Sequence, residues 1–129
     1  MFTRLSISDQ NGFTLVEIIA VLIILSVLAA IVVPKFIDLE QNAKQKAFDG
    51  AISELNSQEN LVWAYLKVST TGYQDDAQLM LLVDYNLGTD YAWQPGDPVT
   101  AGGDLTFKEK TVSLNRTQSN VSQPAVWSR

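Results

Sequence analysis

An apolar run from Phe13 to Val33 constrains this chain more than any other feature of its sequence. Only Thr14, Glu17 and Ser26 interrupt the run with polar side chains. A helix that crosses the hydrocarbon core of a bilayer needs about 20 mostly apolar residues, so the run is long enough to span a membrane. An acidic side chain there costs roughly 2.5–3.5 kcal/mol at mid-membrane and less toward the ends. We therefore expect another group to compensate Glu17.

A cleaved secretory signal explains the run poorly. The apolar part of such a signal has about 7–15 residues and ends at a cleavage site made of small residues. Here Leu28-Ala29-Ala30 is followed by further apolar residues and then by Pro34 and Lys35. Cleavage at the far end of the run is therefore not expected.

The sequence Gly12-Phe13-Thr14-Leu15-Val16-Glu17, with the apolar run and Pro34 after it, resembles the prepilin signal of the type IV filament superfamily. That superfamily includes the type IV pilins and the pseudopilins of type II secretion. The resemblance covers about the first quarter of the chain. It implies that residues 1–12 are a leader, that a prepilin peptidase cuts after Gly12 at the cytoplasmic membrane face, and that the new amino group of Phe13 is methylated.

The resemblance also implies a partner for Glu17, which is the amino terminus of a neighbouring subunit in a helical filament. Gly12 leaves the backbone open to a protease, and a new amine at Phe13 lies about 6 Å of helix rise from Glu17. Two opposite charges 4 Å apart are worth about 4 kcal/mol at an effective dielectric constant of 20. The alternative is that Glu17 sits at the headgroup level of an ordinary anchor.

Beyond the run, apolar residues recur at helical spacing with charged residues mostly on the other faces. This pattern predicts one helix from about Phe13 to Thr70, with Gly72 as its left-handed terminator. Pro34 cannot donate a hydrogen bond to the carbonyl of Ala30, so we expect a helix kink there. In filaments of the superfamily that the chain resembles, the segment around such a proline can loosen, and the resemblance therefore implies a weak stretch from about residue 30 to 36. The alternative is a proline that is simply tolerated in a membrane helix.

The last part of the chain predicts shorter elements. A short helix is expected at 75–83, and an antiparallel sheet of about three strands is expected from Tyr91 onward, with a turn near Glu109-Lys110. The apolar face of this sheet, with Trp93 and Phe107, should pack on the helix stripe of Phe48, Ile52, Leu55 and Val62. The tail from 118 to 129 is expected to be loose unless Val126 and Trp127 dock.

The predicted fold class is therefore α+β, with a long N-terminal helix whose second half packs against a small antiparallel sheet, as in pilins. The expected divisions are a leader at 1–12, a transmembrane and filament-core segment at 13–33, an amphipathic continuation of the helix at 34–71 and a small globular head at 72–129. A head of that size cannot readily build its own core, so it needs the helix.

Composition argues against several function classes. The chain has 129 residues, a formal charge of −5, no histidine and no cysteine. Without these residues the commonest catalytic arrangements are missing, and without clustered basic residues no nucleic-acid binding is expected. No cofactor is expected. Six aspartates offer oxygen atoms to calcium, but none has EF-hand spacing, and exposed turn residues are the simpler interpretation: Asp75, Asp76, Asp84, Asp90, Asp97 and Asp104.

The hypothesis from sequence is a structural subunit of a type IV pilus-like filament, held in the bacterial inner membrane by a single span and then polymerised into a periplasmic or extracellular filament. The resemblance implies as partners a prepilin peptidase, an inner-membrane platform protein, a cytoplasmic assembly ATPase, the lipid bilayer and copies of the chain itself. Three alternatives stay open, which are a pseudopilin of type II secretion, a minor subunit at the filament tip and a membrane-anchored periplasmic binding module that never polymerises. Electron conduction along spaced aromatic residues is a further hypothesis, although core packing explains those residues more simply.

Overall fold

The computed structural model describes residues 12–129, so the predicted leader lies outside the described residues except for Gly12. The described chain forms two compact units, one that extends to Glu40 and one from Gln41 to Arg129. Its elements confirm the predicted α+β class, and they are α1 (Leu15–Val68), α2 (Asp76–Leu82), β1 (Tyr91–Val99), β2 (Gly102–Phe107), β3 (Lys110–Thr117) and β4 (Val126–Ser128).

Helix α1 ends close to the predicted position. The last helical residue is Val68, and Gly72 adopts the left-handed conformation that the sequence predicted, with φ of 68°. The amide of Ser69 donates to the carbonyl of Tyr65, and the amide of Gly72 donates to the carbonyl of Ser69. These bonds satisfy backbone groups that the end of the helix leaves open.

Helix α2 confirms the prediction of a short helix after Gly72. Asp75 is its N-cap, and the Asp75 carboxylate accepts a hydrogen bond of 2.8 Å from the amide of Gln78. Such a cap satisfies an amide that the first turn cannot pair. On the apolar side of α2, Leu79 is completely buried.

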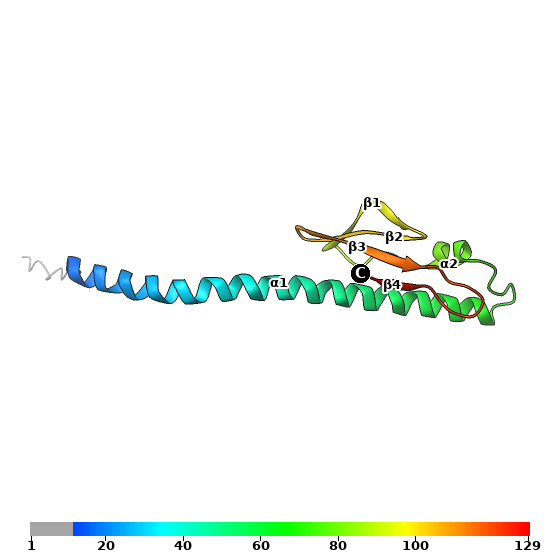
Figure 1. Cartoon of the computed structure of the whole chain (residues 1–129), viewed down its shortest axis with the longest axis horizontal. Helices are drawn as coiled ribbons and strands as arrows, with labels where there is room; N and C mark the ends of the chain where they lie inside the picture. The colour runs from blue at the N-terminus through cyan, green and yellow to red at the C-terminus, as the bar shows by residue number, and fades with distance from the viewer. Residues whose placement is uncertain (1–11) are drawn as a thin grey trace, which may run out of the picture. The chain divides into compact units, whose positions relative to one another are not determined.

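The sheet contains four strands in the order β1-β2-β3-β4, and every neighbouring pair is antiparallel. The prediction of about three strands was therefore wrong by one strand. The turn between β2 and β3 lies at residues 108–109, next to the predicted position, and Lys108 has a positive φ of 53°. Figure 1 shows the four strands beside the part of α1 that belongs to the second unit.

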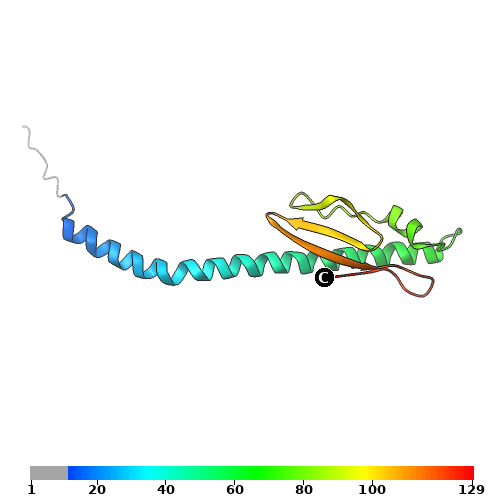
Figure 2. The same cartoon turned by 45° about the horizontal axis from the view of Figure 1, so that its top comes forward.

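Two apolar clusters join the second half of α1 to the rest of the second unit. The larger one contains Phe48, Ala51, Leu55, Leu105, Leu114 and Trp127, with Ile52, Trp93 and Phe107 packed against it. This confirms the predicted stripe except for one residue, since Val62 packs instead on a second cluster with Leu66, Leu79 and Val83. Val62 lies nearer the C-terminal end of α1 than the residues that contact the sheet, and Leu79 of α2 belongs to the cluster against which it packs. Figure 2 shows β2 and β3 lying along α1.

The C-terminal tail is docked rather than loose. Trp127 is 1% exposed, and its backbone amide donates to the side chain of Asn56 at 2.7 Å, while the Asn56 amide group donates back to the Trp127 carbonyl at 3.1 Å. Farther along α1, the indole of Trp63 and the ammonium group of Lys67 donate to backbone carbonyls of the loop before β4. The tail thus forms β4, the strand that the sequence analysis missed.

A buried ionic network lies between α1, α2 and β3. The Arg116 guanidinium donates from Nε to Glu59 Oε1 at 2.7 Å and from Nη2 to Glu59 Oε2 at 3.1 Å. It also donates from Nη1 and Nη2 to the two carboxylate oxygens of Asp76, at 2.7 and 2.9 Å. The side chains of Arg116 and Glu59 are fully buried. The planar guanidinium suits this geometry because it presents parallel N–H groups to each carboxylate.

Neutral side chains complete the network. The Glu59 carboxylate also accepts hydrogen bonds from the hydroxyl of Tyr85 at 3.2 Å and from the indole of Trp127 at 2.9 Å. Burial and the negative charge of Glu59 raise the pKa of the Tyr85 hydroxyl, so it stays protonated as a donor. Among the described residues, no buried side-chain nitrogen or oxygen lacks a hydrogen-bond partner. The network therefore meets the condition under which buried charge is tolerated.

Replacing one ionic partner should destabilise the head strongly. In Arg116→Met the two carboxylates lose their counter-charge, and breaking a buried pair in this way costs about 3–5 kcal/mol. Arg129→Met is the matched control, because Arg129 pairs with Asp49 at a half-exposed site and such pairs contribute less than about 1 kcal/mol. Urea unfolding of the detergent-solubilised chain, followed by tryptophan fluorescence, measures both. Equal losses in the two variants would contradict the central role of Arg116.

Asp76 should make the stability of the head depend on pH. Burial alone would raise the pKa of Asp76, but hydrogen bonds from Arg116 and Ser119 outweigh burial and lower the pKa below its ordinary value. The stabilisation is therefore complete above the unfolded-state pKa of about 3.9 and is lost as the pH falls through the lower folded-state pKa.

The measurement compares wild type with Asp76→Asn by urea unfolding between about pH 6 and pH 3. The variant should be less stable at the higher pH, and the difference should narrow in acid. Asp90→Asn serves as the control at an exposed position, where no such narrowing is expected. A difference that stays constant with pH would count against the role of Asp76.

Candidate functional site

The start of α1 is closed by a reciprocal pair of hydrogen bonds between Thr14 and Glu17. The amide of Thr14 donates to Glu17 Oε2 at 2.8 Å, and the amide of Glu17 donates to Thr14 Oγ1 at 3.2 Å. This arrangement is a capping box, in which the N-cap hydroxyl and the acid three residues later each satisfy one backbone amide. Sequence reasoning missed this capping role of Thr14, although the Thr-x-x-Glu spacing was the signal for it.

The capping box uses only part of the Glu17 carboxylate. Oε2 accepts the Thr14 amide, and within residues 12–129 no hydrogen bond is found to Oε1. The predicted compensation of Glu17 therefore has a local component inside the chain. A cation from outside the chain can still approach the second oxygen.

Gly12 and Phe13 lie before the helix begins. Phe13 is 84% exposed, and a Cβ atom built on Gly12 meets no atom within 4 Å among the described residues other than its chain neighbours. Backbone outside a helix and free of neighbours can enter the extended cleft of a protease. Cleavage between the two residues and methylation of Phe13 stay predictions.

The apolar run that follows packs against no other described residue of its own unit. All residues from 12 to 40 are exposed. Helix α1 qualifies by length and composition as a candidate membrane span, and none of its most apolar 18-residue window is buried. The one mid-segment hydroxyl, of Ser26, donates to the carbonyl of Leu22 at 2.6 Å, so it adds little polarity to the surface. Contiguous apolar surface of this extent is typical of contact with lipid or with other proteins.

Pro34 lies inside α1. Its ring nitrogen has no hydrogen to give, so the carbonyl of Ala30 loses its usual partner. The kink and the weak stretch around it stay predictions, as does the role of Pro34 in assembly.

Four of the six aspartates considered as calcium ligands have partners in different parts of the second unit. Asp75 caps α2, Asp76 pairs with Arg116, and the Asp84 and Asp104 carboxylates accept hydrogen bonds from the Asn86 amide and the Ser113 hydroxyl. In the part of the chain that the structure describes, no three acidic side chains meet in a group able to hold a metal ion. The expectation that the chain holds no cofactor stays a prediction.

Two comparisons with known proteins bear on the N-terminal segment. A family model described as the prokaryotic N-terminal methylation motif matches residues 7–33. The Type IV narrow pilus major component PilA5 of Thermus thermophilus is 41% identical over 47 residues. That alignment covers 36% of this chain and 40% of the relative, so the match spans well under half of either protein. No solved structure matches the chain.

Removing the Thr14 hydroxyl should loosen the first turn of α1. Thr14→Ala leaves the Glu17 amide without its acceptor, and loss of an N-cap side chain costs about 1 kcal/mol. Hydrogen exchange of the detergent-solubilised chain should then be about fivefold faster at the Glu17 amide. Thr14→Ser keeps the acceptor and should exchange like wild type. Equal exchange in all three proteins would contradict the capping box.

Proposed function

This chain carries the N-terminal motif and the helix-plus-sheet fold of the type IV pilin superfamily, and we propose that it is a structural subunit of a type IV pilus-like filament. The observation that carries the proposal is the exposed apolar surface of residues 13–33, which begins at a carboxylate with one unoccupied oxygen. The relative named above is itself the major component of a pilus. This supports a pilin over a pseudopilin of type II secretion.

Apolar burial drives the proposed assembly. Fully covering a large apolar side chain is worth roughly 1.5–3 kcal/mol relative to water, so the exposed run is stable only in lipid or against other helices. A subunit held in the inner membrane exchanges lipid for the helices of its neighbours when it joins a filament. Extraction into water is costly in either state, which is why the proposal includes an inner-membrane platform protein and an assembly ATPase.

Glu17 gives the proposed helix bundle its register. Apolar helices slide past one another with little preference, whereas a charge pair is satisfied at one axial offset. After cleavage by a prepilin peptidase, the methylated amine of Phe13 on one copy would meet the free Oε1 of Glu17 on the next. An attraction of about 4 kcal/mol at 4 Å compensates the carboxylate and fixes that offset.

Substituting Glu17 tests this proposal. Glu17→Ala removes both the capping acid and the proposed partner of the neighbouring amine, so filaments should disappear and the monomer should stay in the membrane fraction. Shearing, sedimentation and electron microscopy measure the filament yield. Glu54→Ala is the matched control, because Glu54 is an exposed acid on the same helix. Within residues 12–129, its carboxylate accepts a hydrogen bond from the side chain of Gln58 and from no other residue.

Mass spectrometry of each protein after co-expression with a prepilin peptidase shows whether the leader has been removed. This distinguishes a defect in assembly from a defect in processing. We expect Glu17→Ala and wild type alike to lose residues 1–12. Thr14→Ala separates the two roles of Glu17, because it breaks the capping box but keeps the carboxylate and should still assemble. Normal filaments from Glu17→Ala would overturn the pairing, and an uncut wild-type chain would overturn the processing site.

A further inference from the structure

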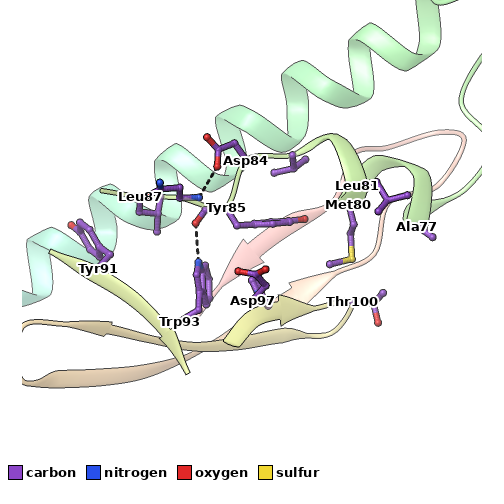
Figure 3. Close-up of a pocket in the computed structure, with 13 residues that line it drawn as sticks. Ala77, Met80, Leu81, Asp84, Tyr85, Leu87, Tyr91, Trp93, Asp97 and Thr100 are labelled. Atoms are coloured by element: carbon purple, nitrogen blue, oxygen red, sulfur yellow. Dashed lines mark hydrogen bonds between the residues drawn. The ribbon is translucent and has the colours of Figure 1, made fainter. Parts of the chain in front are cut away.

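A cavity of about 800 Å³ lies in the second unit, between α2, the segment that follows it and β1. Its volume falls in the range of small-molecule sites, which is about 300–1,000 Å³. Its wall includes the half-buried side chains of Met80, Tyr85, Tyr91 and Trp93 (Figure 3). Part of the wall also belongs to the two apolar clusters, namely Val83, Tyr85, Leu87, Tyr91 and Trp93.

The aromatic side chains of the wall have already used their polar atoms. Trp93 Nε1 donates to the carbonyl of Tyr85 at 2.8 Å, the Tyr85 hydroxyl donates to Glu59, and the Tyr91 hydroxyl donates to the carbonyl of Ala47 at 3.0 Å. The rings therefore offer the cavity carbon surface and π electrons rather than hydrogen-bonding groups. A ligand held there has to be largely apolar.

The charged side chains that line the cavity are both negative. Asp84 and Asp97 line it, and no basic side chain does. The sequence contains no lysine or arginine between Lys67 and Lys108, although it contains six aspartates there. Asp84 accepts the Asn86 amide, whereas no hydrogen bond or ion pair is found for Asp97 within the described residues 12–129.

The strand geometry holds Asp97 at this position. The pairing of β1 with β2 is interrupted between Gln94 and Val99, and the buried Pro98 anchors the interrupted stretch. Asp97 projects from β1 into the cavity, between Trp93 and Met80 (Figure 3). An exposed carboxylate with no partner therefore faces an aromatic wall.

We propose that this cavity binds an organic cation, namely an ammonium group with apolar substituents. Aromatic rings attract such cations, and quaternary ammonium groups are recognised in this way. Asp97 supplies the opposite charge at one side of the site. An anion would be repelled by the two aspartates, and a bare metal ion would find too few oxygen ligands. The inference does not depend on filament assembly.

Choline and its neutral isostere 3,3-dimethylbutan-1-ol test the proposal. They differ only in the exchange of a charged nitrogen for carbon, so their comparison isolates the charge from the shape. Each is titrated into the full chain in nonionic detergent at constant ionic strength, with tryptophan fluorescence and chemical shifts of labelled tryptophan as readouts. We expect choline to bind at least about tenfold more tightly than the isostere. Equal binding of the two, or no binding of choline and butylammonium alike, overturns the proposal.

Asp97→Asn and Glu109→Gln form the matched pair of variants. Each replaces an exposed carboxylate by its amide, but Glu109 lies in the turn between β2 and β3, away from the cavity. Choline affinity should fall about tenfold in Asp97→Asn, because the attraction between opposite charges is lost, and stay unchanged in Glu109→Gln, while circular dichroism shows that both remain folded. Equal affinities in the two variants overturn the role of Asp97.

Butylammonium distinguishes the two sources of such a group. It mimics the end of a lysine side chain, whereas choline mimics a soluble methylated amine. Tighter binding of choline assigns the cavity to a soluble ligand, and tighter binding of butylammonium assigns it to a lysine of another polypeptide. Because all titrations use the dispersed chain, their outcome is independent of whether Glu17 supports filaments.

Discussion

The Arg116 guanidinium is the contact on which the head depends. It joins Glu59 of α1 to Asp76 of α2 from its own position on β3, and the indole of Trp127 brings β4 to the same carboxylate. Four elements that are distant in the sequence thus meet at one buried charge cluster. The chain has no cysteine, so this cluster and the apolar clusters beside it hold the C-terminal tail where a small extracytoplasmic domain often uses a disulfide.

The two units of the chain differ in whether they bury their own apolar side chains. From Gln41 onward, apolar side chains are gathered into clusters and buried polar atoms are paired. Residues 13–33 instead expose their apolar side chains. At the start of this segment, the side chains of Thr14 and Glu17 satisfy backbone amides of the first helical turn. The second unit therefore buries its own apolar core, whereas the apolar side chains of the N-terminal segment can be buried only by lipid or by other copies of the chain. That difference is the physical basis of the proposed filament subunit.

Sequence reasoning predicted most elements because their signals are local. Helical spacing gave α1, Gly72 marked its end, and Asp75 marked the start of α2. The strand β4 was missed because a three-residue strand carries no periodic pattern, and only the burial of Trp127 reveals it. The ionic network was missed for a related reason. Glu59 looks like a surface charge on a helix, and its partner stands 57 residues later, so only the folded chain brings them together. The cavity beside Asp97 likewise depends on an interrupted strand that no local signal predicts.

The capping box at the start of α1 has a consequence for the timing of maturation. Thr14 and Glu17 both lie downstream of Gly12, so their hydrogen bonds cross no bond that the peptidase is proposed to break. Trimming would change the charge and length of the chain end ahead of the helix and leave its first turn intact. The first turn of α1 in a mature subunit would then already have its final conformation when the subunit meets its neighbours. It would keep this conformation while the subunit is held in the lipid.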